Sequence, residues 1–186
     1  MKWELPLDVE IEGKTFKIRN KCDYKVVLDV ISVFNDAELT QEEQLRCALF
    51  IFYEDLSGCA DVHAAIREMM KIIGSGTEEE DKPSENNKPP LMNWEHDFLQ
   101  IVPPINRVLG YSVRDPKNYT HWNDFVGAYM EIGECHFSTI VSIREKLQKR
   151  KPLEKWEQEF YRENKRIVDL PCTNMTEDEL EWLESD

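Results

Sequence analysis

The sequence predicts a mainly α-helical protein (α+β), with an N-terminal β-hairpin followed by about six to seven helices in two small lobes. Three observations predict it. Residues 8–18 alternate between apolar and polar side chains. Apolar residues then recur at helical spacing through most of 24–74 and 92–168. The segment between those two stretches has almost no apolar residues. A period of two is typical of strands and a period near 3.6 of helices, so the hairpin comes first and the helices follow.

The hairpin is predicted by apolar residues on either side of a short turn. Val9 and Ile11 precede Glu12-Gly13, and Phe16 and Ile18 follow it. Glycine adopts a positive φ without steric cost, as a tight hairpin turn requires. A lone two-stranded hairpin is marginal in water, so this one is expected to lie on the helices that follow.

Three helices are expected in a first lobe, residues 1–74. The first carries an apolar stripe that begins at Tyr24. Thr40 and Glu43 have the spacing of a capping box for the second helix. Asp61 can cap the third helix, and Gly74 can end it.

A second, helical lobe is expected at residues 92–171. Its apolar stripes begin in turn near Phe98, Trp122, Phe137 and Leu153. Pro103 and Pro104 interrupt the first stripe. A proline inside a helix removes a hydrogen bond and costs about 3 kcal/mol, so a kink or break is expected near Val102.

Two polar segments complete the organisation. Residues 75–91 are expected to be a flexible acidic linker. Residues 172–186 form an acidic tail in which Thr176 and Glu179 have capping-box spacing. The short helix predicted there has Leu180, Trp182 and Leu183 on its apolar side, and it is expected to dock on its own domain or in a groove of another protein.

Charge and cysteine usage limit the function classes. The chain has 37 acidic and 23 basic residues, for a net charge of −14, which disfavours nucleic-acid binding. The tail carries a charge of −6, whereas residues 144–166 carry nine bases and five acids. This basic stretch could bind the tail or an acidic partner. Alternatively, both segments are simply solvent-exposed faces. No apolar run approaches a membrane span or a signal peptide, and five scattered cysteines suggest free thiols in a reducing cytosol.

The stretch 119–136 is the strongest candidate for chemistry. His121, Cys135 and His136 could supply three zinc ligands, but no second pair has finger-like spacing. Base stacking on Trp122 or Tyr129 is a second alternative, which the overall charge disfavours. No phosphate-binding loop, dinucleotide fingerprint or nucleophile elbow is present. We therefore expect a protein without enzymatic activity and without catalytic, cofactor-binding or metal-binding residues.

Structural roles explain the same residues more simply. Aromatic and apolar residues at helical spacing are usually core, so the following are expected in the core of the second lobe: Trp122, Phe125, Val126 and Tyr129. His121 and Asp124 are expected to fix a helix start or a local hydrogen bond. Arg144 is expected to form a structural ion pair with an acid, for which Asp97 is the candidate.

Seven motifs occur in an order and spacing that resemble a known family. They are E-G-K-T-F-K-I (12–18), F-I-F-Y (50–53), W-E-H-D-F with Trp94 and Asp97 (94–98), L-G-Y with Tyr111 (109–111), H-W-N-D-F (121–125), F-S-T-I-V-S-I-R (137–144) and F-Y-R-E-N-K-R-I-V-D-L-P (160–171). Over roughly residues 5–171 the chain is similar to the gene-product-fifteen family of siphophages that infect Gram-positive hosts. It departs from the family pattern at Asn123, at the two prolines and in the order Gly110-Tyr111.

The resemblance implies a non-enzymatic role. Genes of that family lie just ahead of the tape-measure gene, where tail assembly chaperones are encoded. The implied function is a chaperone or adaptor that binds the tape-measure protein and helps recruit tail-tube subunits, in the host cytoplasm and absent from the mature virion. Self-association or a companion assembly chaperone are further candidate partners; nucleic acid and membrane are not. The alternatives are a minor structural component retained in the tail and, less favoured, a small metal-dependent hydrolase.

Overall fold

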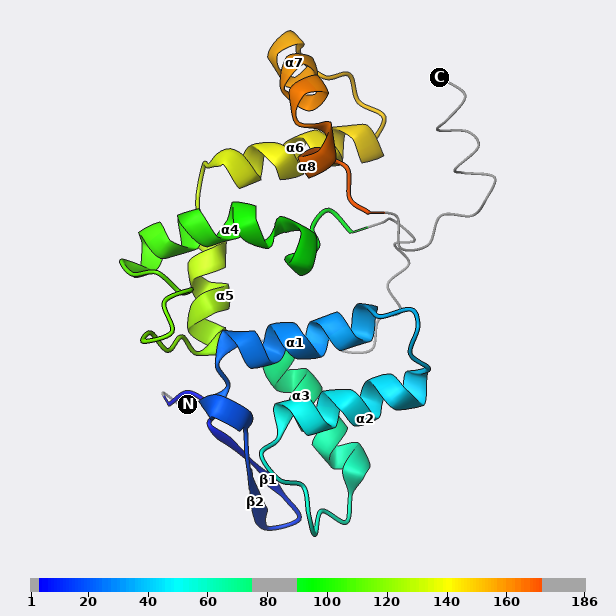
Figure 1. The fold of residues 1–186 in the computed structure, drawn as a ribbon, viewed down its shortest axis with the longest axis vertical. Helices are drawn as coiled ribbons and strands as arrows, with labels where there is room; N and C mark the ends of the chain where they lie inside the picture. Colours follow the sequence, from blue (N-terminus) through cyan, green and yellow to red (C-terminus); the bar gives the residue numbers. More distant parts are fainter. Residues whose placement is uncertain (1–3, 75–89, 172–186) are drawn as a thin grey trace. The chain divides into compact units, whose positions relative to one another are not determined.

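The computed structural model describes residues 4–74 and 90–171 (Figure 1). In these residues an antiparallel two-stranded sheet precedes eight α-helices, which confirms the predicted mainly α-helical fold with a small β component. The elements are β1 (Asp8–Ile11), β2 (Lys14–Lys17), α1 (Tyr24–Asn35), α2 (Gln41–Phe52), α3 (Val62–Ile73), α4 (Trp94–Leu109), α5 (Trp122–Met130), α6 (His136–Gln148), α7 (Lys155–Glu163) and α8 (Lys165–Val168). No helix in the described segments is both long and apolar enough to cross a lipid bilayer.

The N-terminal hairpin forms around the expected turn. Val9 pairs with Phe16, and both are buried together with Ile11. The turn residues Glu12 and Gly13 have φ values of 50° and 75°. Two central residues with positive φ match the type I′ turn, whose twist suits a two-residue hairpin.

The hairpin is tied to the end of α2. Ile18 forms an isolated antiparallel bridge with Tyr53. Arg19 donates hydrogen bonds to the carbonyl oxygens of Phe50, Ile51 and Tyr53, at 2.8, 2.9 and 2.8 Å. The last carbonyls of a helix lack intrahelical partners, so this cation satisfies the C-terminal end of α2 and holds the hairpin beside it.

The helix starts predicted for α2 and α3 are confirmed. Glu43 Oε2 accepts from the Thr40 backbone N–H at 2.9 Å, and the Thr40 hydroxyl accepts from the Glu43 N–H at 3.4 Å. Asp61 Oδ1 accepts from Ala64 N–H at 2.8 Å. Gly74 follows the last residue of α3 as its C-cap.

The chain forms two compact units, which are divided differently from the expected lobes. Unit 1 contains residues 4–74 and 100–135, and unit 2 contains residues 90–99 and 136–171. Residues 100–135 therefore join the N-terminal helices rather than the rest of 92–171. The cause is long-range backbone pairing, which sequence periodicity does not reveal: Tyr24 N–H donates to the Thr120 carbonyl at 2.9 Å, and Trp122 N–H donates to the Cys22 carbonyl at 2.9 Å.

Of the kink or break expected near Val102, the break is absent, because α4 runs through Pro103 and Pro104. The two missing N–H groups leave the carbonyls of Leu99 and Gln100 without intrahelical partners. Three apolar side chains around the prolines are buried, namely Ile101, Val102 and Ile105. Burying each such side chain contributes about 1.5–3 kcal/mol, which offsets the cost of the prolines.

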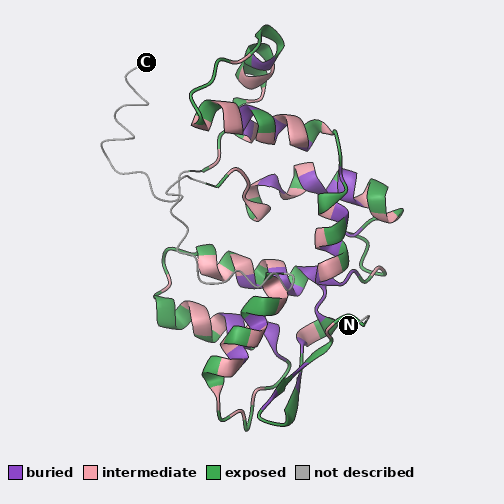
Figure 2. Cartoon of the chain, turned by 180° about the vertical axis from the view of Figure 1, so that it is seen from behind, coloured by how far each residue is buried: buried purple, intermediate pink, exposed green. Residues whose placement is uncertain are grey.

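Burial follows one face of most helices (Figure 2). The core of unit 1 joins β1, β2, α1, α2, α3, α5 and the C-terminal half of α4. Unit 2 has a much smaller centre. Ile140, Ile143 and Val168 are buried there, and four half-buried residues pack against them, namely Leu153, Phe160, Tyr161 and Ile167. Unit 2 therefore depends more than unit 1 on its polar contacts.

Candidate functional site

The polar centre of unit 2 is the predicted ion pair between Arg144 and Asp97, which is confirmed. The two guanidinium nitrogens Nη1 and Nη2 each donate to one carboxylate oxygen of Asp97 at 2.7 Å. The same guanidinium donates to the carbonyls of Val168 at 2.6 Å, Ile167 at 2.7 Å and Leu91 at 3.0 Å. The side chains of Arg144 and Asp97 are 6% and 0% exposed. All five donors of the arginine fork are used inside the protein.

The start of α4 orients Asp97. Asn93 Oδ1 accepts from His96 N–H at 2.9 Å, and Asn93 N–H donates to Asp97 Oδ2 at 3.0 Å. Trp94 is the first residue of the helix and is half-buried. Leu91 was expected to end the flexible linker, but its carbonyl is fixed by Arg144. The remainder of that linker, residues 75–89, lies outside the described residues.

A second ion pair connects α6 with the start of α7. Lys146 donates to both carboxylate oxygens of Glu157, at 2.6 and 2.7 Å, and Glu154 N–H donates to Glu157 Oε2 at 2.8 Å. The Lys146 hydrogen bonds lower the pKa of Glu157, with the Glu154 backbone hydrogen bond as the next contribution. The carboxylate of Glu157 therefore stays ionised. It caps the start of α7 and holds α7 to α6.

His121 is the N-cap of α5, as expected from the sequence. Its Nδ1 accepts from Asn123 N–H at 3.0 Å, and Nε2 lies 3.1 Å from the Pro6 carbonyl oxygen. A carbonyl can only accept, so Nε2 carries the proton of the neutral ring. Asp124 lies in the first turn, where a negative charge suits the helix dipole. Both nitrogens of this buried ring are thus committed to the backbone.

The aromatic residues after His121 form part of the core, but in unit 1. Phe125 stacks on Tyr24 of α1 with ring centroids 4.4 Å apart, and on Trp122 at 6.0 Å. Trp122 Nε1 donates to the Ile73 carbonyl at 2.9 Å and so satisfies the end of α3. Val126 and Tyr129 are half-buried. The expected core role is correct for Trp122 and Phe125, and the unit to which they belong is corrected.

The loop before α5 is held to α1 by polar contacts. Asp23 caps α1 through Lys25 N–H at 3.0 Å, and its second oxygen accepts from Thr120 N–H at 3.4 Å. Tyr111 and Thr120 share a hydrogen bond of 3.0 Å between their hydroxyl oxygens. Burial raises the pKa of the neighbouring Cys22 thiol to about 12, and the charge of Asp23 adds to this effect. A thiol in this environment is not a nucleophile near neutral pH.

The metal-site alternative would have to use His121. Coordination through either ring nitrogen would break a backbone hydrogen bond inside unit 1. His136 belongs to unit 2, where its ring lies 5.3 Å from that of Phe160. Across residues 4–74 and 90–171, no three His, Cys, Asp or Glu side chains are placed to share a metal ion. The arrangement is that of a packed helix junction.

One surface residue stands out that was not among the candidate site residues expected from the sequence. Phe50 lies near the end of α2 with 77% of its surface exposed, and the Arg19 guanidinium lies 5.6 Å from its ring centroid. Helical spacing assigns Phe52 to the core and leaves Phe50 on the outer face. The three carbonyl bonds of Arg19 hold the backbone beneath Phe50, so the aromatic ring is presented from a fixed position.

The expected tail residues Leu180, Trp182 and Leu183 lie outside the described residues. Every other candidate residue takes part in one of the two units: Trp94, Asp97 and Arg144 in unit 2, and Tyr111, His121, Trp122 and Phe125 in unit 1.

Comparison with known protein families identifies one that matches most of the chain. A family model described as "Bacteriophage Gp15 protein" matches residues 1–170. The chain belongs to this family. No curated protein and no solved structure matches it. The Gp15 match covers all of unit 1 and nearly all described residues of unit 2, and it ends before the acidic tail.

Proposed function

We propose that this Gp15-family protein is a tail assembly chaperone or adaptor, which binds the phage tape-measure protein in the host cytoplasm, helps to recruit tail-tube subunits and acts without catalysis. Its membership of a bacteriophage family over residues 1–170 is the observation that carries the proposal. The proposal is supported by the side chains of His121, Asp97 and Arg144, because their polar groups bind other parts of the chain and hold helices together.

Charge also supports an assembly role. A tape-measure protein is long, helical and apolar in places, so uncovered segments would aggregate. The chain carries −14, and a coat of many such chains would keep the complex dispersed by self-repulsion. Moderate affinity at each site, multiplied along the length of the tape measure, would still allow release.

Phe50 is the candidate contact for an apolar helical partner. Aromatic side chains are enriched in protein interfaces, and Arg19 holds the backbone beneath this exposed ring. Substituting Phe50→Ala removes the exposed ring while leaving the Arg19 bonds to backbone carbonyls intact. Glu42→Ala is the matched control, because Glu42 is an equally exposed polar residue on the same helix.

The test is co-elution with purified tape-measure segments in size-exclusion chromatography. We expect the wild-type chain and Glu42→Ala to co-elute, and Phe50→Ala to bind more weakly at an unchanged melting temperature. If the wild-type chain elutes alone with every tape-measure segment, the proposed function is wrong. If Phe50→Ala binds as well as wild type, only the assignment of Phe50 is wrong.

The resemblance keeps one alternative open, a minor structural component of the tail. Mass spectrometry of purified virions separates the two roles. An assembly chaperone is expected to be missing from finished particles, whereas a structural component would be present at a fixed number of copies.

A further inference from the structure

We propose that the acidic tail, residues 172–186, docks on a basic surface of its own unit 2, formed by Arg162, Lys165 and Arg166. We call these three residues the α7–α8 basic surface. The inference is independent of the proposed function, since it concerns the chain alone.

The α7–α8 basic surface lies at an open depression. Residues 162–167 and Asp169 line it, and the three cations are all exposed. Arg162 approaches Glu159 only at 4.0 Å, whereas Asp169 accepts from the Tyr161 hydroxyl at 2.9 Å. Asp169, the acid nearest to the start of the tail, is thus already hydrogen-bonded, and the three cations are accessible to an anionic segment.

Charge is distributed so that unit 2 attracts the tail. The described residues of unit 2 hold nine bases and eight acids, a net charge of +1, although the chain as a whole carries −14. The tail holds six acids and no base, a charge of −6. Described unit 1 holds eleven bases and eighteen acids, a charge of −7, and would repel the tail. Unit 2 is therefore the electrostatically favoured docking site for the tail.

The tail also starts beside this surface. Val168 ends α8, and Pro171 is the last described residue before the tail. Six peptide units separate Pro171 from Glu177, a reach of roughly 20 Å when extended. A tether this short gives an effective concentration on the order of millimolar, so weak contacts suffice.

Apolar surface provides the second half of the match. Ile140, Ile143 and Val168 form a small buried cluster in unit 2, and Phe160, Tyr161 and Ile167, which pack against it, are only half-buried. In the short acidic helix predicted for the tail, Leu180 and Leu183 are three residues apart and share one side. Docking would cover the apolar edge of unit 2 with that side, while the acids pair with the three cations.

The experiment uses hydrogen exchange of the full chain at low salt. We expect amides of residues 177–184 to exchange about tenfold more slowly than in an unstructured peptide, and the protection to fall as salt is raised. We also expect carbodiimide to link Lys165 to tail carboxylates. A mixture of isotopically light and heavy chains is expected to give links only within one chain.

Charge reversal tests whether the tail binds the α7–α8 basic surface. Lys165→Glu with Arg166→Glu is expected to abolish tail protection, and adding Glu177→Lys with Glu181→Lys is expected to restore it. Arg114→Glu with Lys117→Glu is the control, because it makes the same change in net charge at exposed positions of unit 1. Protection of the Val168 amide shows whether α8 itself is intact.

A tail variant keeps the proposal testable if charge reversal disturbs α8. Leu180→Ser with Trp182→Ser changes none of the described residues and is expected to remove tail protection. Unprotected tail amides in the wild-type chain, links only between different chains, or equal loss in the unit 1 control would each overturn the proposal.

Discussion

Arg144 and Asp97, 47 positions apart in the sequence, form a two-point ion pair inside unit 2, and Arg144 also binds three backbone carbonyls. The pair joins α6 with the start of α4, and the carbonyl bonds add Leu91 and the end of α8. Because the apolar core of unit 2 is small, this network fixes how its segments meet.

Removing one partner of this pair is expected to unfold unit 2. Arg144→Ala leaves the Asp97 carboxylate buried without its cation and removes a hydrogen-bond donor from three backbone carbonyls. Breaking a buried pair in this way typically costs about 3–5 kcal/mol. Urea unfolding followed by hydrogen exchange should show protection lost from α6 and α8 and kept in α1 and α2. Arg46→Ala removes an exposed ion pair on α2 and is expected to change stability by less than about 1 kcal/mol. Equal effects of the two substitutions would contradict this role of Arg144.

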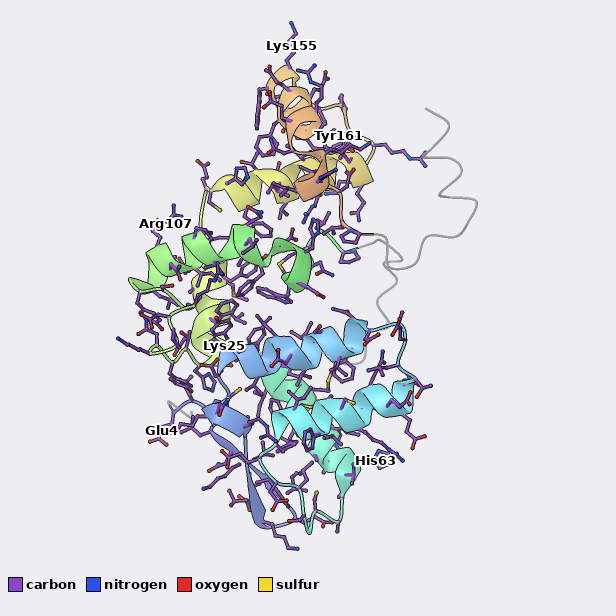
Figure 3. All side chains as sticks on the ribbon, viewed as in Figure 1. Glu4, Lys25, His63, Arg107, Lys155 and Tyr161 are labelled. Atoms are coloured by element: carbon purple, nitrogen blue, oxygen red, sulfur yellow. The ribbon has the colours of Figure 1, made fainter. Side chains whose placement is uncertain are left out.

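The His121 cap gives a smaller and local prediction. His121→Ala removes the acceptor for Asn123 N–H, and loss of an N-cap costs about 1 kcal/mol, with further loss from the Pro6 contact. His121→Asn can restore the cap and is expected to recover part of the stability. His63→Ala, at an exposed position on α3 (Figure 3), is the control. Chemical denaturation measures all three, and an Asn variant no better than Ala would exclude the capping role.

The thiol of Cys22 is expected to report unfolding of unit 1. Its pKa is raised from 9.0 to about 12 by burial, so the reactive thiolate is scarce at pH 8. Iodoacetamide should label half-buried Cys47 in the native chain and label Cys22 only after denaturation. A pKa raised in the folded state means that stability is fully present below pH 9.0 and is lost as pH rises toward 12. Rapid native labelling of Cys22 would show that the site is open.

Glu157 gives the corresponding prediction in acid. Its pKa is lowered from the ordinary value of 4.5, chiefly by the Lys146 hydrogen bonds. A lowered pKa means that this stabilisation is present above pH 4.5 and is lost as the pH falls through the folded-state pKa. The stability difference between wild type and Glu157→Gln should therefore be largest near pH 7 and shrink below pH 4.5. Glu159→Gln, in an exposed and distant pair, should differ little from wild type at any pH. A gap that stays constant with pH would exclude the ionised carboxylate as its cause.

Local signals allowed much of the fold to be predicted from the sequence. The Glu12-Gly13 turn and the Thr40–Glu43 box each depend on residues close together in the chain, and both are confirmed. The Arg144–Asp97 pair was also expected, as a structural ion pair, and is confirmed.

Long-range backbone contacts could not be predicted in the same way. The bond from Trp122 to the Ile73 carbonyl and those from Arg19 to the end of α2 use acceptors that every residue carries, so they leave no pattern in the sequence. For the same reason residues 100–135 were assigned to the wrong group of helices. Of the kink or break predicted near Val102, the break does not occur, because burial on both sides outweighs the local cost of the prolines.

The most direct measurement of the central claim is the amount of tape-measure protein that stays soluble when the two proteins are co-expressed in the cytoplasm of a bacterial host. The account predicts that the wild-type chain raises the soluble fraction and sediments with the tape measure in several copies, and that Arg144→Ala does so less well. A tape measure that precipitates equally with and without the chain would contradict the account.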